Sequence, residues 1–346
     1  MYDLLVFIGR FQPFHREHKR VVDIALTKAH NVLVLVGSSN RARSPKNPFT
    51  YLERSDMILN AFEPGTSLYT DSIRDFPYDD DKWANQVREC IKFVALDIVN
   101  EGGFHNHGVA DAKIGIIGAK KDDTSFYLDM FPEFPLEEVG LDHAIHATDI
   151  RHGYFTGGIW DDVPESAYKF MVNFERTEEF ANLVNWQAEV DEYKKLWASA
   201  PYPVKQVTAD AIVKYRDRVL LVKRAKDPGF GQWAVPGGHV NVGERVEVAA
   251  LRELREETLI PLTDAELRSR IEGKQVFDDP GRSTIGHVIT HAVLIDLSDL
   301  EEQPEVIGAD DAYAAIWARL DRITEDMFYD DHWHMIQHFL GSNNGY

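Results

Sequence analysis

The sequence predicts an α/β protein of two domains, a doubly wound parallel sheet followed by an α+β domain. Three observations support this prediction. The chain has 346 residues, 44% of them hydrophobic, which is too long for one ordinary domain. Up to about residue 180, short apolar runs alternate with stretches of helical periodicity. Beyond residue 203 the pattern becomes β-rich, with apolar and polar residues alternating.

The first half of the chain predicts strands and helices in regular alternation. The apolar runs LLVFIG, NVLVLVG and KIGIIGA predict buried strands, and SLYTDSI predicts another. Helices are expected from about His18 to Ala29, around residues 51–62, from near Asp81 and from about Pro164. Ligands of such sheets bind at the carboxyl ends of the strands, so the loops after the three apolar runs are the expected site.

A long helix is expected to join the two halves. Residues 178–200 predict it, and the segment PYP at 201–203 ends it. We therefore expect a first domain at 1–185, a helical linker at 186–203 and a second domain at 204–346. In the second domain, two strands meet at a turn over 216–218, and VITHAVLIDL predicts a further strand. The linker's expected apolar stripe comprises Phe180, Val184, Trp186, Val190, Tyr193 and Trp197.

The charge and the cysteine content exclude several classes of protein. With 57 acidic and 37 basic residues the formal charge is -20, so neither nucleic acid nor an anionic membrane is an expected partner. Small anionic substrates remain possible, because helix N-termini and cations act locally. The single Cys90 excludes an intramolecular disulfide, and neither a signal peptide nor an apolar run of membrane-spanning length is present. These features predict a cytoplasmic protein.

The loop after the first predicted strand carries a candidate phosphate site. In GRFQPFHREH, His15 and His18 stand three residues apart at the start of the next helix. There they can donate N–H groups to a polyphosphate, and the helix dipole adds to the attraction. Adenylyl transfer needs such positioning and charge neutralisation more than it needs a covalent nucleophile. The alternative is a pair of polar surface histidines.

This loop resembles the motif Gly-x-Phe-x-Pro-x-His-x-Gly-His of the nucleotidyltransferase superfamily. The resemblance implies a Rossmann-like domain whose two histidines bind the phosphates of ATP, with Gly9, Arg10 and Phe11 as further substrate contacts. Glu17 stands where the family has glycine. Its carboxylate would repel the phosphates unless it turns to solvent or toward a metal. The matching residues are Gly9, Phe11, Pro13, His15 and His18.

A second superfamily motif, Ile-Ser-x-Thr-x-x-Arg, is partly matched by IHATDIR, where His146 replaces the serine. The resemblance implies that Arg151 clamps the β- or γ-phosphate, since a guanidinium offers rigid multidentate donors. Thr148 would donate from a helix start. For an isolated arginine, a surface ion pair is the alternative.

Nearly the whole chain resembles the nicotinamide mononucleotide adenylyltransferase branch that is fused to a Nudix hydrolase, notably at 43–54, 81–83 and 118–132. This resemblance implies ATP and nicotinamide mononucleotide as substrates and NAD as product. Trp83 would stack on the nicotinamide ring, with a core aromatic as the alternative. Asn47 and Arg54 would face the mononucleotide, Arg54 as its phosphate contact. Each could instead cap a helix or lie on the surface.

Three glutamates in the second domain predict a metal site. Glu253, Glu256 and Glu257 fall on one face of a helix, where their carboxylates repel one another unless a hard cation binds them. Mg²⁺ is the expected cation, and Mn²⁺ is possible. A solvated acidic face is the alternative. Ala250, Leu251, Leu254 and Val248 are expected to pack the opposite face.

The segment from Gly238 to Ile260 resembles the Nudix box, in which glycine, glutamate and Arg-Glu-apolar-x-Glu-Glu recur at fixed spacing. This implies an α/β/α sandwich that hydrolyses ADP-ribose to AMP and ribose 5-phosphate, with Gly238 and the three glutamates at the metal. Leu259 replaces the family's glycine, so we expect the left-handed helix cap to be lost. The matches are Gly238, Glu244, Arg252, Glu253, Leu254, Glu256 and Glu257.

Substrate contacts in the second domain are less specific. Arg224 and Arg282 are candidates for holding phosphates or the terminal ribose, and surface arginines are an equal alternative. Two other functions stay open. The chain could use another acceptor and another Nudix substrate, or its second domain could sense ADP-ribose without cleaving it. Sensors usually lack a metal glutamate, whereas this chain has all three.

Overall fold

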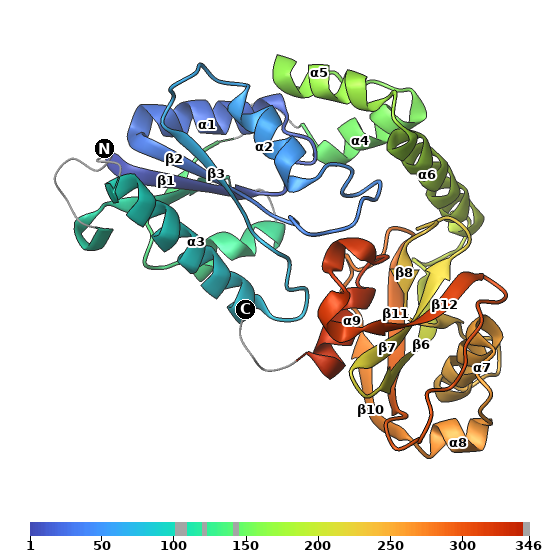
Figure 1. Ribbon diagram of the computed structural model, residues 1–346. Coiled ribbons are helices and arrows are strands. Elements are labelled where there is room, and N and C mark those ends of the chain that lie inside the picture. Colours follow the sequence, from blue (N-terminus) through green and yellow to red (C-terminus); the bar gives the residue numbers. More distant parts are fainter. Residues whose placement is uncertain (101–108, 120–122, 141–144, 342–346) are drawn as a thin grey trace. The chain divides into compact units, whose positions relative to one another are not determined.

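The computed structural model describes residues 1–100, 109–119, 123–140 and 145–341 (Figure 1). Residues 120–122, which belong to one segment of the family resemblance, lie outside these ranges. The chain divides into two compact units, Met1–Val184 and Asn185–Tyr346, so the division falls within helix α6 (Glu178–Trp197). None of the helices in the described ranges has both the length and the apolar character needed to cross a bilayer.

Five parallel strands form the sheet of the first unit, in the order β3-β2-β1-β4-β5. The chain winds outward from β1 in one direction and then in the other, so the strand order reverses between β1 and β4. At that reversal the connections diverge and leave a crevice at the carboxyl ends of the strands. The predicted doubly wound parallel sheet is confirmed. The strands are β1 (Tyr2–Gly9), β2 (Ala29–Val36), β3 (Leu68–Ser72), β4 (Ile114–Gly118) and β5 (Leu136–Glu138).

Helices cover both faces of this sheet (Figure 1). Helices α1 (Arg16–Lys28) and α2 (Tyr51–Leu59) lie over one face, and α3 (Asp80–Asn100) lies over the other. Apolar residues of α3 recur every three or four positions, which gives it one buried stripe against β1, β2 and β4. Helices α4 (Ala147–Thr156) and α5 (Glu165–Phe174) then lead to α6.

The second unit is built on a mixed sheet whose main path is β10-β11-β6-β7-β12. Strands β6 and β11 pair in parallel, and the other neighbours along the path are antiparallel. Two short strands extend the sheet, β8 on β7 and β9 on β6. The strands are β6 (Lys205–Tyr215), β7 (Arg218–Arg224), β8 (Trp233–Ala234), β9 (Gly237–His239), β10 (Ile271–Phe277), β11 (His287–Asp296) and β12 (Ala312–Arg319).

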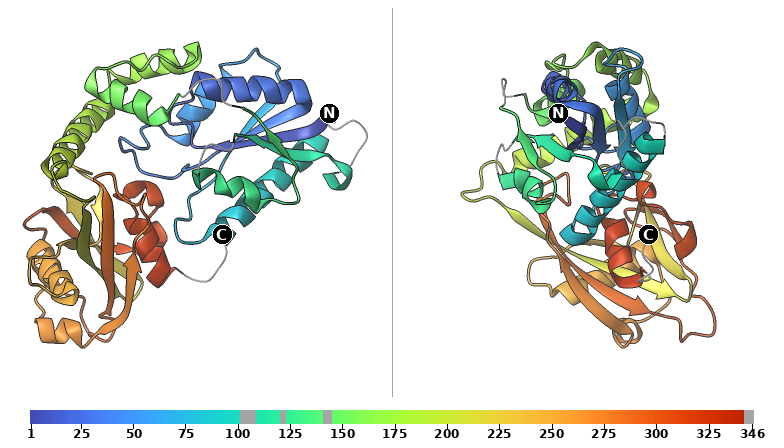
Figure 2. Two further views of the ribbon diagram at one scale, coloured as in Figure 1. Left: turned by 180° about the vertical axis from the view of Figure 1, so that it is seen from behind. Right: turned by 90° about the vertical axis from the view of Figure 1, so that its left-hand side faces the viewer.

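Helices α7 (Val246–Thr258) and α9 (His332–Leu340) pack on opposite faces of the second sheet, and Figure 2 shows them on either side of the strands. Helix α8 (Asp264–Arg268) follows α7. This is the predicted α/β/α sandwich. The predicted packing face of α7 is correct for its alanine and leucines, but Val248 is 37% exposed and does not belong to it.

The end of α7 departs from the prediction at Leu259. We expected the replacement of glycine to remove the left-handed cap, but Leu259 itself adopts that conformation, with φ 48° and ψ 28°. Its N–H donates to the carbonyl oxygen of Arg255 at 3.0 Å, which closes the helix. The surrounding fold therefore imposes the cap on a residue that disfavours it.

The buried face of α6 is narrower than the predicted stripe. Trp186 and Val190 are buried as predicted, and Leu183 is buried as well. Trp197, by contrast, is 47% exposed at the end of the helix, where its ring lies 6.4 Å from that of Tyr193. The predicted stripe was wrong at this position.

Candidate active sites

The two histidines of the first loop form the start of α1. His15 is the N-cap residue, and its Nδ1 accepts a hydrogen bond from the backbone N–H of His18 at 3.4 Å. Nδ1 of His18 accepts in turn from the N–H of His15 at 3.3 Å, and the ring centroids lie 3.4 Å apart. In each neutral ring Nε2 then carries the hydrogen. Both imidazoles can therefore donate to an anion at the helix N-terminus.

Phe11 supports this arrangement from inside the fold. Its side chain is 1% exposed, and its ring meets the imidazole of His18 edge to face at 4.9 Å. A Cβ added to Gly9 would come within 2.9 Å of the same ring, so the glycine permits the close approach. The ring of Phe11 therefore positions His18, and a contact of Phe11 with substrate stays a prediction.

Glu17 is paired within its own helix, whereas its position in the motif had indicated that its charge would repel the phosphates. The side chain is buried, and its carboxylate pairs with the guanidinium of Arg20 at 2.6 Å on the same helix. The carboxylate is therefore shielded from solvent and paired within α1. The ion pair neutralises the charge that would otherwise repel a polyphosphate.

A pair of arginines gives the first loop its positive charge. Arg151 of α4 donates to the carbonyl oxygen of Gln12 at 2.6 Å and to the hydroxyl of Thr148 at 3.2 Å. Burial and the nearby charge of Arg10 lower the pKa of Arg151 to about 10. Like charges held this close are stabilised by an anion between them. The structure thus brings Arg10, Thr148 and Arg151 to the loop that carries the histidines.

Arg54 is a buried arginine in the interior of the first unit. Its side chain is 0% exposed, and its guanidinium donates to the carbonyl oxygens of Arg10 and Gly37 at 2.6 Å each. Further donors reach the carbonyl oxygens of Ser38 and Thr50 at 3.1 Å. Burial lowers its pKa to about 10. Arg54 therefore ties three loop segments together as an internal cross-link, and its contact with the mononucleotide phosphate stays a prediction.

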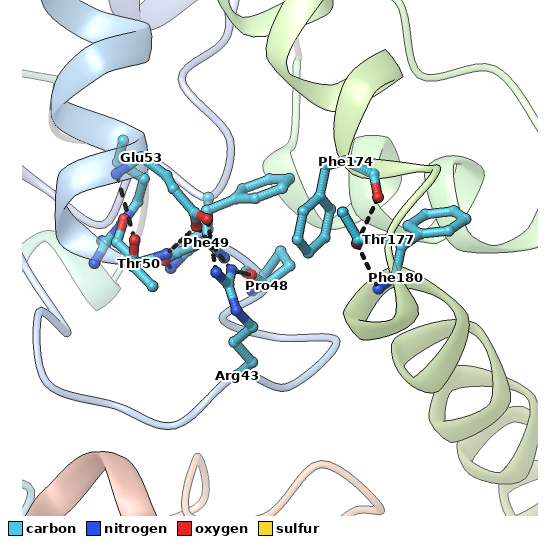
Figure 3. A network of polar contacts seen from close by, with 10 residues as sticks. Arg43, Pro48, Phe49, Thr50, Glu53, Phe174, Thr177 and Phe180 are labelled. Atoms are coloured by element: carbon cyan, nitrogen blue, oxygen red, sulfur yellow. Dashed lines mark hydrogen bonds and ion pairs between the residues drawn. The ribbon is translucent and has the colours of Figure 1, made fainter.

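The loop before α2 is fixed by a second arginine, Arg43, as Figure 3 shows. Arg43 donates to both carboxylate oxygens of Glu53, at 2.6 and 2.7 Å, and lies 5.1 Å from the ring centre of Phe174. Glu53 also completes a capping box with Thr50 at the start of α2. The backbone between Arg43 and Thr50 is therefore rigidly held beside the first loop.

Gln12 joins these two loops, and the sequence prediction missed it. Its amide donates to the carbonyl oxygen of Phe49 at 2.8 Å and accepts from the N–H of Phe49 at 3.0 Å. Gln12 is 3% exposed, so both bonds are shielded from water. A glutamine inside a phosphate-loop motif carries no signal of such a clamp, because its partner lies 37 residues further along the chain.

Asn47 and Trp83 are the residues predicted to bind the mononucleotide. The Oδ1 atom of Asn47 is buried and, in the described part of the chain, has no hydrogen-bond partner. A ligand donor would satisfy it. Trp83 is half-buried and packs against the rings of Tyr127 and Phe131, each at 5.9 Å. The Tyr127 hydroxyl donates to the carbonyl oxygen of Ile8, which places this aromatic group next to the end of β1.

The predicted metal residues of the second unit line one cavity of about 640 Å³, a size that suits a nucleotide. Gly238 lies on β9, and a Cβ there would meet the Glu253 carboxylate at 2.6 Å. The Glu257 carboxylate accepts from the N–H of Gly237 at 3.1 Å. Strand β9 and helix α7 thus bring Gly238, Glu253, Glu256 and Glu257 to the same place.

Arg252 organises the acidic face of α7. Its guanidinium donates to Glu244 at 2.9 and 3.0 Å, to Glu253 at 2.7 Å and to Glu256 at 2.9 Å. The hydrogen bonds to Arg252 hold the pKa of Glu244 at about 2. One cation therefore stabilises three carboxylates that would otherwise repel one another.

Three carboxylates of the cavity have raised pKa values. Burial raises the pKa of Glu257 to about 8 and that of Asp210, on β6, to about 7, and it also raises the pKa of Glu253. Buried carboxylates of raised pKa fit a hard divalent cation, whose charge would displace the bound protons.

The described residues nevertheless include no group of three acidic, histidine or cysteine side chains that is gathered closely enough to hold a metal ion. The carboxylates of the three glutamates instead face hydrogen-bond partners within the protein. Glu253 and Glu256 point to Arg252, and Glu257 points to the N–H of Gly237. The donor set fits a divalent cation in its chemistry.

The two candidate arginines differ in their surroundings. Arg282 is 7% exposed and forms a bidentate ion pair with Asp331 at 2.7 and 2.9 Å, and it lines the cavity as well, so its contact with substrate stays a prediction. Arg224 lines the cavity, with its guanidinium 4.2 Å from the ring centre of Tyr329. Both arginines therefore stay candidate substrate contacts, Arg282 with a carboxylate partner already in place.

Asp210 is a cavity residue that the sequence prediction missed. It lies on β6 in register with Gly237, where a Cβ would come within 1.7 Å of its carboxylate. The signal was present in TADAIV, because an acidic residue amid apolar neighbours on a central strand is rarely buried without a function.

Comparison with known protein families gives one match in each unit of the chain. Residues 6–76 match the cytidylyltransferase-like family, and residues 204–339 match the NUDIX domain. A nicotinamide/nicotinic acid mononucleotide adenylyltransferase of Acinetobacter baylyi is 36% identical over 53% of this chain and 92% of its own. An ADP-ribose pyrophosphatase of Methanocaldococcus jannaschii is 34% identical over 40% of this chain and 75% of its own.

Solved structures match along nearly the whole chain. One of them is a bifunctional NMN adenylyltransferase/ADP ribose pyrophosphatase from Francisella tularensis, complexed with AMP and a manganese ion. The two chains are 32% identical, with a TM-score of 0.88, and the match covers 98% of this chain and 99% of that chain. This chain therefore belongs to the family of bifunctional NMN adenylyltransferase/ADP-ribose pyrophosphatase proteins.

Proposed function

We propose that this protein makes NAD in its first unit and hydrolyses ADP-ribose in its second. The first reaction joins the adenylyl group of ATP to nicotinamide mononucleotide and releases pyrophosphate. The second yields AMP and ribose 5-phosphate and depends on Mg²⁺, with Mn²⁺ as a substitute. The observation that carries the proposal is the match of nearly the entire chain to one bifunctional enzyme. The cytoplasm stays the predicted compartment.

In the first unit, the nucleotide phosphates would bind at the start of α1. The Nε2–H groups of His15 and His18 would donate to them, and Arg10 and Arg151 would neutralise the charge that develops on the α-phosphate and on the leaving pyrophosphate. This is supported by the stacked imidazoles and by the lowered pKa of Arg151. Asn47 and Trp83 remain the candidates for binding the mononucleotide.

In the second unit, Glu253, Glu256 and Glu257 would hold the divalent cation, with the backbone of Gly238 beside them. When bound, the cation would neutralise the pyrophosphate and activate the attacking water. Arg252 would keep the glutamates oriented, as its hydrogen bonds to Glu253 and Glu256 support. Arg224 would contact a phosphate from the other side of the cavity.

Product analysis by chromatography tests both halves of the proposal. One reaction contains the protein, Mg²⁺, ATP and nicotinamide mononucleotide, and a second contains the protein, Mg²⁺ and ADP-ribose. We expect NAD in the first and AMP with ribose 5-phosphate in the second. If AMP forms without NAD, the first unit uses another acceptor. If ADP-ribose binds but is not cleaved, the second unit is a sensor and the hydrolase assignment is wrong.

A further inference from the structure

One side of the hydrolase cavity is formed by residues outside the segment 204–339 that matches the NUDIX domain. Four residues of α6 line it together with the glutamates of α7. Their spacing of three and four positions puts them on one face of the helix. We call this face the α6 wall, and it consists of Glu189, Glu192, Tyr193 and Leu196.

The neighbouring side of α6 fixes the helix on the second unit. Trp186 is 4% exposed, its ring packs against Tyr329 at 5.8 Å, and its Nε1 donates to the hydroxyl of Thr284 at 3.3 Å. Val190, one turn further along, is buried as well. These contacts hold the helix so that the α6 wall faces the cavity.

The chemistry of the α6 wall suits an uncharged part of a nucleotide. Glu189 and Glu192 carry negative charge, so they repel a pyrophosphate, and Arg224 elsewhere in the cavity attracts one. Tyr193 offers a flat aromatic ring, and aromatic rings bind nucleobases by stacking. The carboxylates can accept hydrogen bonds from an amino group or from ribose hydroxyls.

We propose that the α6 wall completes the hydrolase site by binding the nucleoside end of ADP-ribose. The base packs on Tyr193 beside Leu196, and Glu189 and Glu192 accept hydrogen bonds from the adenine amino group or the ribose hydroxyls. This inference rests on the proposed hydrolase function. It makes the helix that joins the two units a determinant of hydrolase specificity.

The test is the Tyr193→Ala variant of the full-length protein, assayed for ADP-ribose hydrolysis with AMP and ribose 5-phosphate as competitive inhibitors. We expect KM for ADP-ribose and the inhibition constant of AMP each to rise about tenfold, because stacking is lost. The inhibition constant of ribose 5-phosphate should stay unchanged, and kcat should stay within about twofold because the metal glutamates are untouched. Glu192→Gln should raise the AMP constant too, by a smaller factor.

Tyr202→Ala is the matched control, since Tyr202 is 81% exposed and does not line the cavity. Unaltered adenylyl transfer by each variant shows that the first unit has folded, and a kcat of hydrolysis close to that of the wild-type protein shows that the second unit has folded. An unchanged AMP constant in both Tyr193→Ala and Glu192→Gln would overturn the proposal. So would a rise for ribose 5-phosphate alone, which would place the terminal ribose at the α6 wall.

The failure of the proposed function would look different. In that case the wild-type protein would leave ADP-ribose intact, and calorimetric titration with AMP would replace the kinetic assay. A tenfold weaker affinity of Tyr193→Ala for AMP would still support the α6 wall. Equal affinities of the variant and the wild-type protein would overturn it.

Discussion

At the scale of single residues, the two sites depend on buried charges that have specific partners. Arg54 donates to four backbone carbonyl oxygens, and Arg282 pairs with Asp331 in the interior. Both arginines had been predicted to contact substrate. A sequence shows the charge of a residue but not its depth, and an arginine that holds loops together looks the same as one that binds phosphate.

The Arg54→Met variant tests whether Arg54 has this structural role. We expect it to destabilise the first unit by about 3–5 kcal/mol, because the carbonyl oxygens of Arg10, Gly37 and Ser38 would be left buried without a donor. Urea denaturation measures the loss, and ADP-ribose hydrolysis should persist as a control for the second unit. A variant of normal stability that has only a raised KM for nicotinamide mononucleotide would support the phosphate-contact prediction instead.

His15 has two roles that one substitution can separate. Asparagine is among the best N-cap residues, so His15→Asn should change the stability of the protein by less than about 1 kcal/mol. It removes the Nε2–H donor, so adenylyl transfer should fall by a factor of about 100 or more. Thermal denaturation and initial rates measure the two effects. An active His15→Asn variant would limit His15 to a structural role.

The raised pKa of Glu257, about 8, predicts how stability depends on pH in the absence of metal. Between about pH 4.5 and 8 the folded protein keeps a proton that the unfolded chain releases. The free energy of unfolding should therefore fall as the pH rises through this range, and Glu257→Gln should reduce the fall. Denaturation in chelator at pH 5, 6, 7 and 8 measures it. A stability that increases over this interval in chelator would contradict the burial argument.

At the scale of elements, the end of α7 shows a local preference overridden by the fold. Leu259 adopts φ 48°, which a leucine disfavours by about 1–2 kcal/mol relative to glycine. Leu259→Gly should therefore stabilise the second unit by about 0.5–1 kcal/mol, after the entropic cost of glycine in the unfolded chain. Thermal denaturation measures the gain. Leu259→Ala keeps the unfavourable backbone and should give no gain.

The elements also show how far a sequence can predict a site. The apolar runs predicted β1, β2 and β4, and the spacing of the glutamates predicted the acidic face of α7, because both signals are local and periodic. The clamp between Gln12 and Phe49 and the approach of Asp210 to Gly237 were missed. These pairs are far apart in the sequence, so only the folded chain brings them together.

At the scale of the whole molecule, two compact units meet within a single helix, and the proposed reactions are opposite in direction. One unit makes a dinucleotide from mononucleotides, and the other cleaves a dinucleotide-like pyrophosphate. Each site gathers its residues from within its own unit, so each reaction should depend on its own residues alone. The sequence predicted this organisation from its two motifs, while the share of α6 in the hydrolase cavity could not be predicted, since α6 precedes the matched domain.

The most direct test of the central claim is product analysis of two single-site variants beside the wild-type protein. Glu256→Gln should abolish AMP release from ADP-ribose and leave NAD formation at the wild-type rate. His18→Ala should abolish NAD formation and leave ADP-ribose hydrolysis unchanged. These opposite losses would establish two independent active sites in one chain. Loss of both activities in either variant would contradict the account.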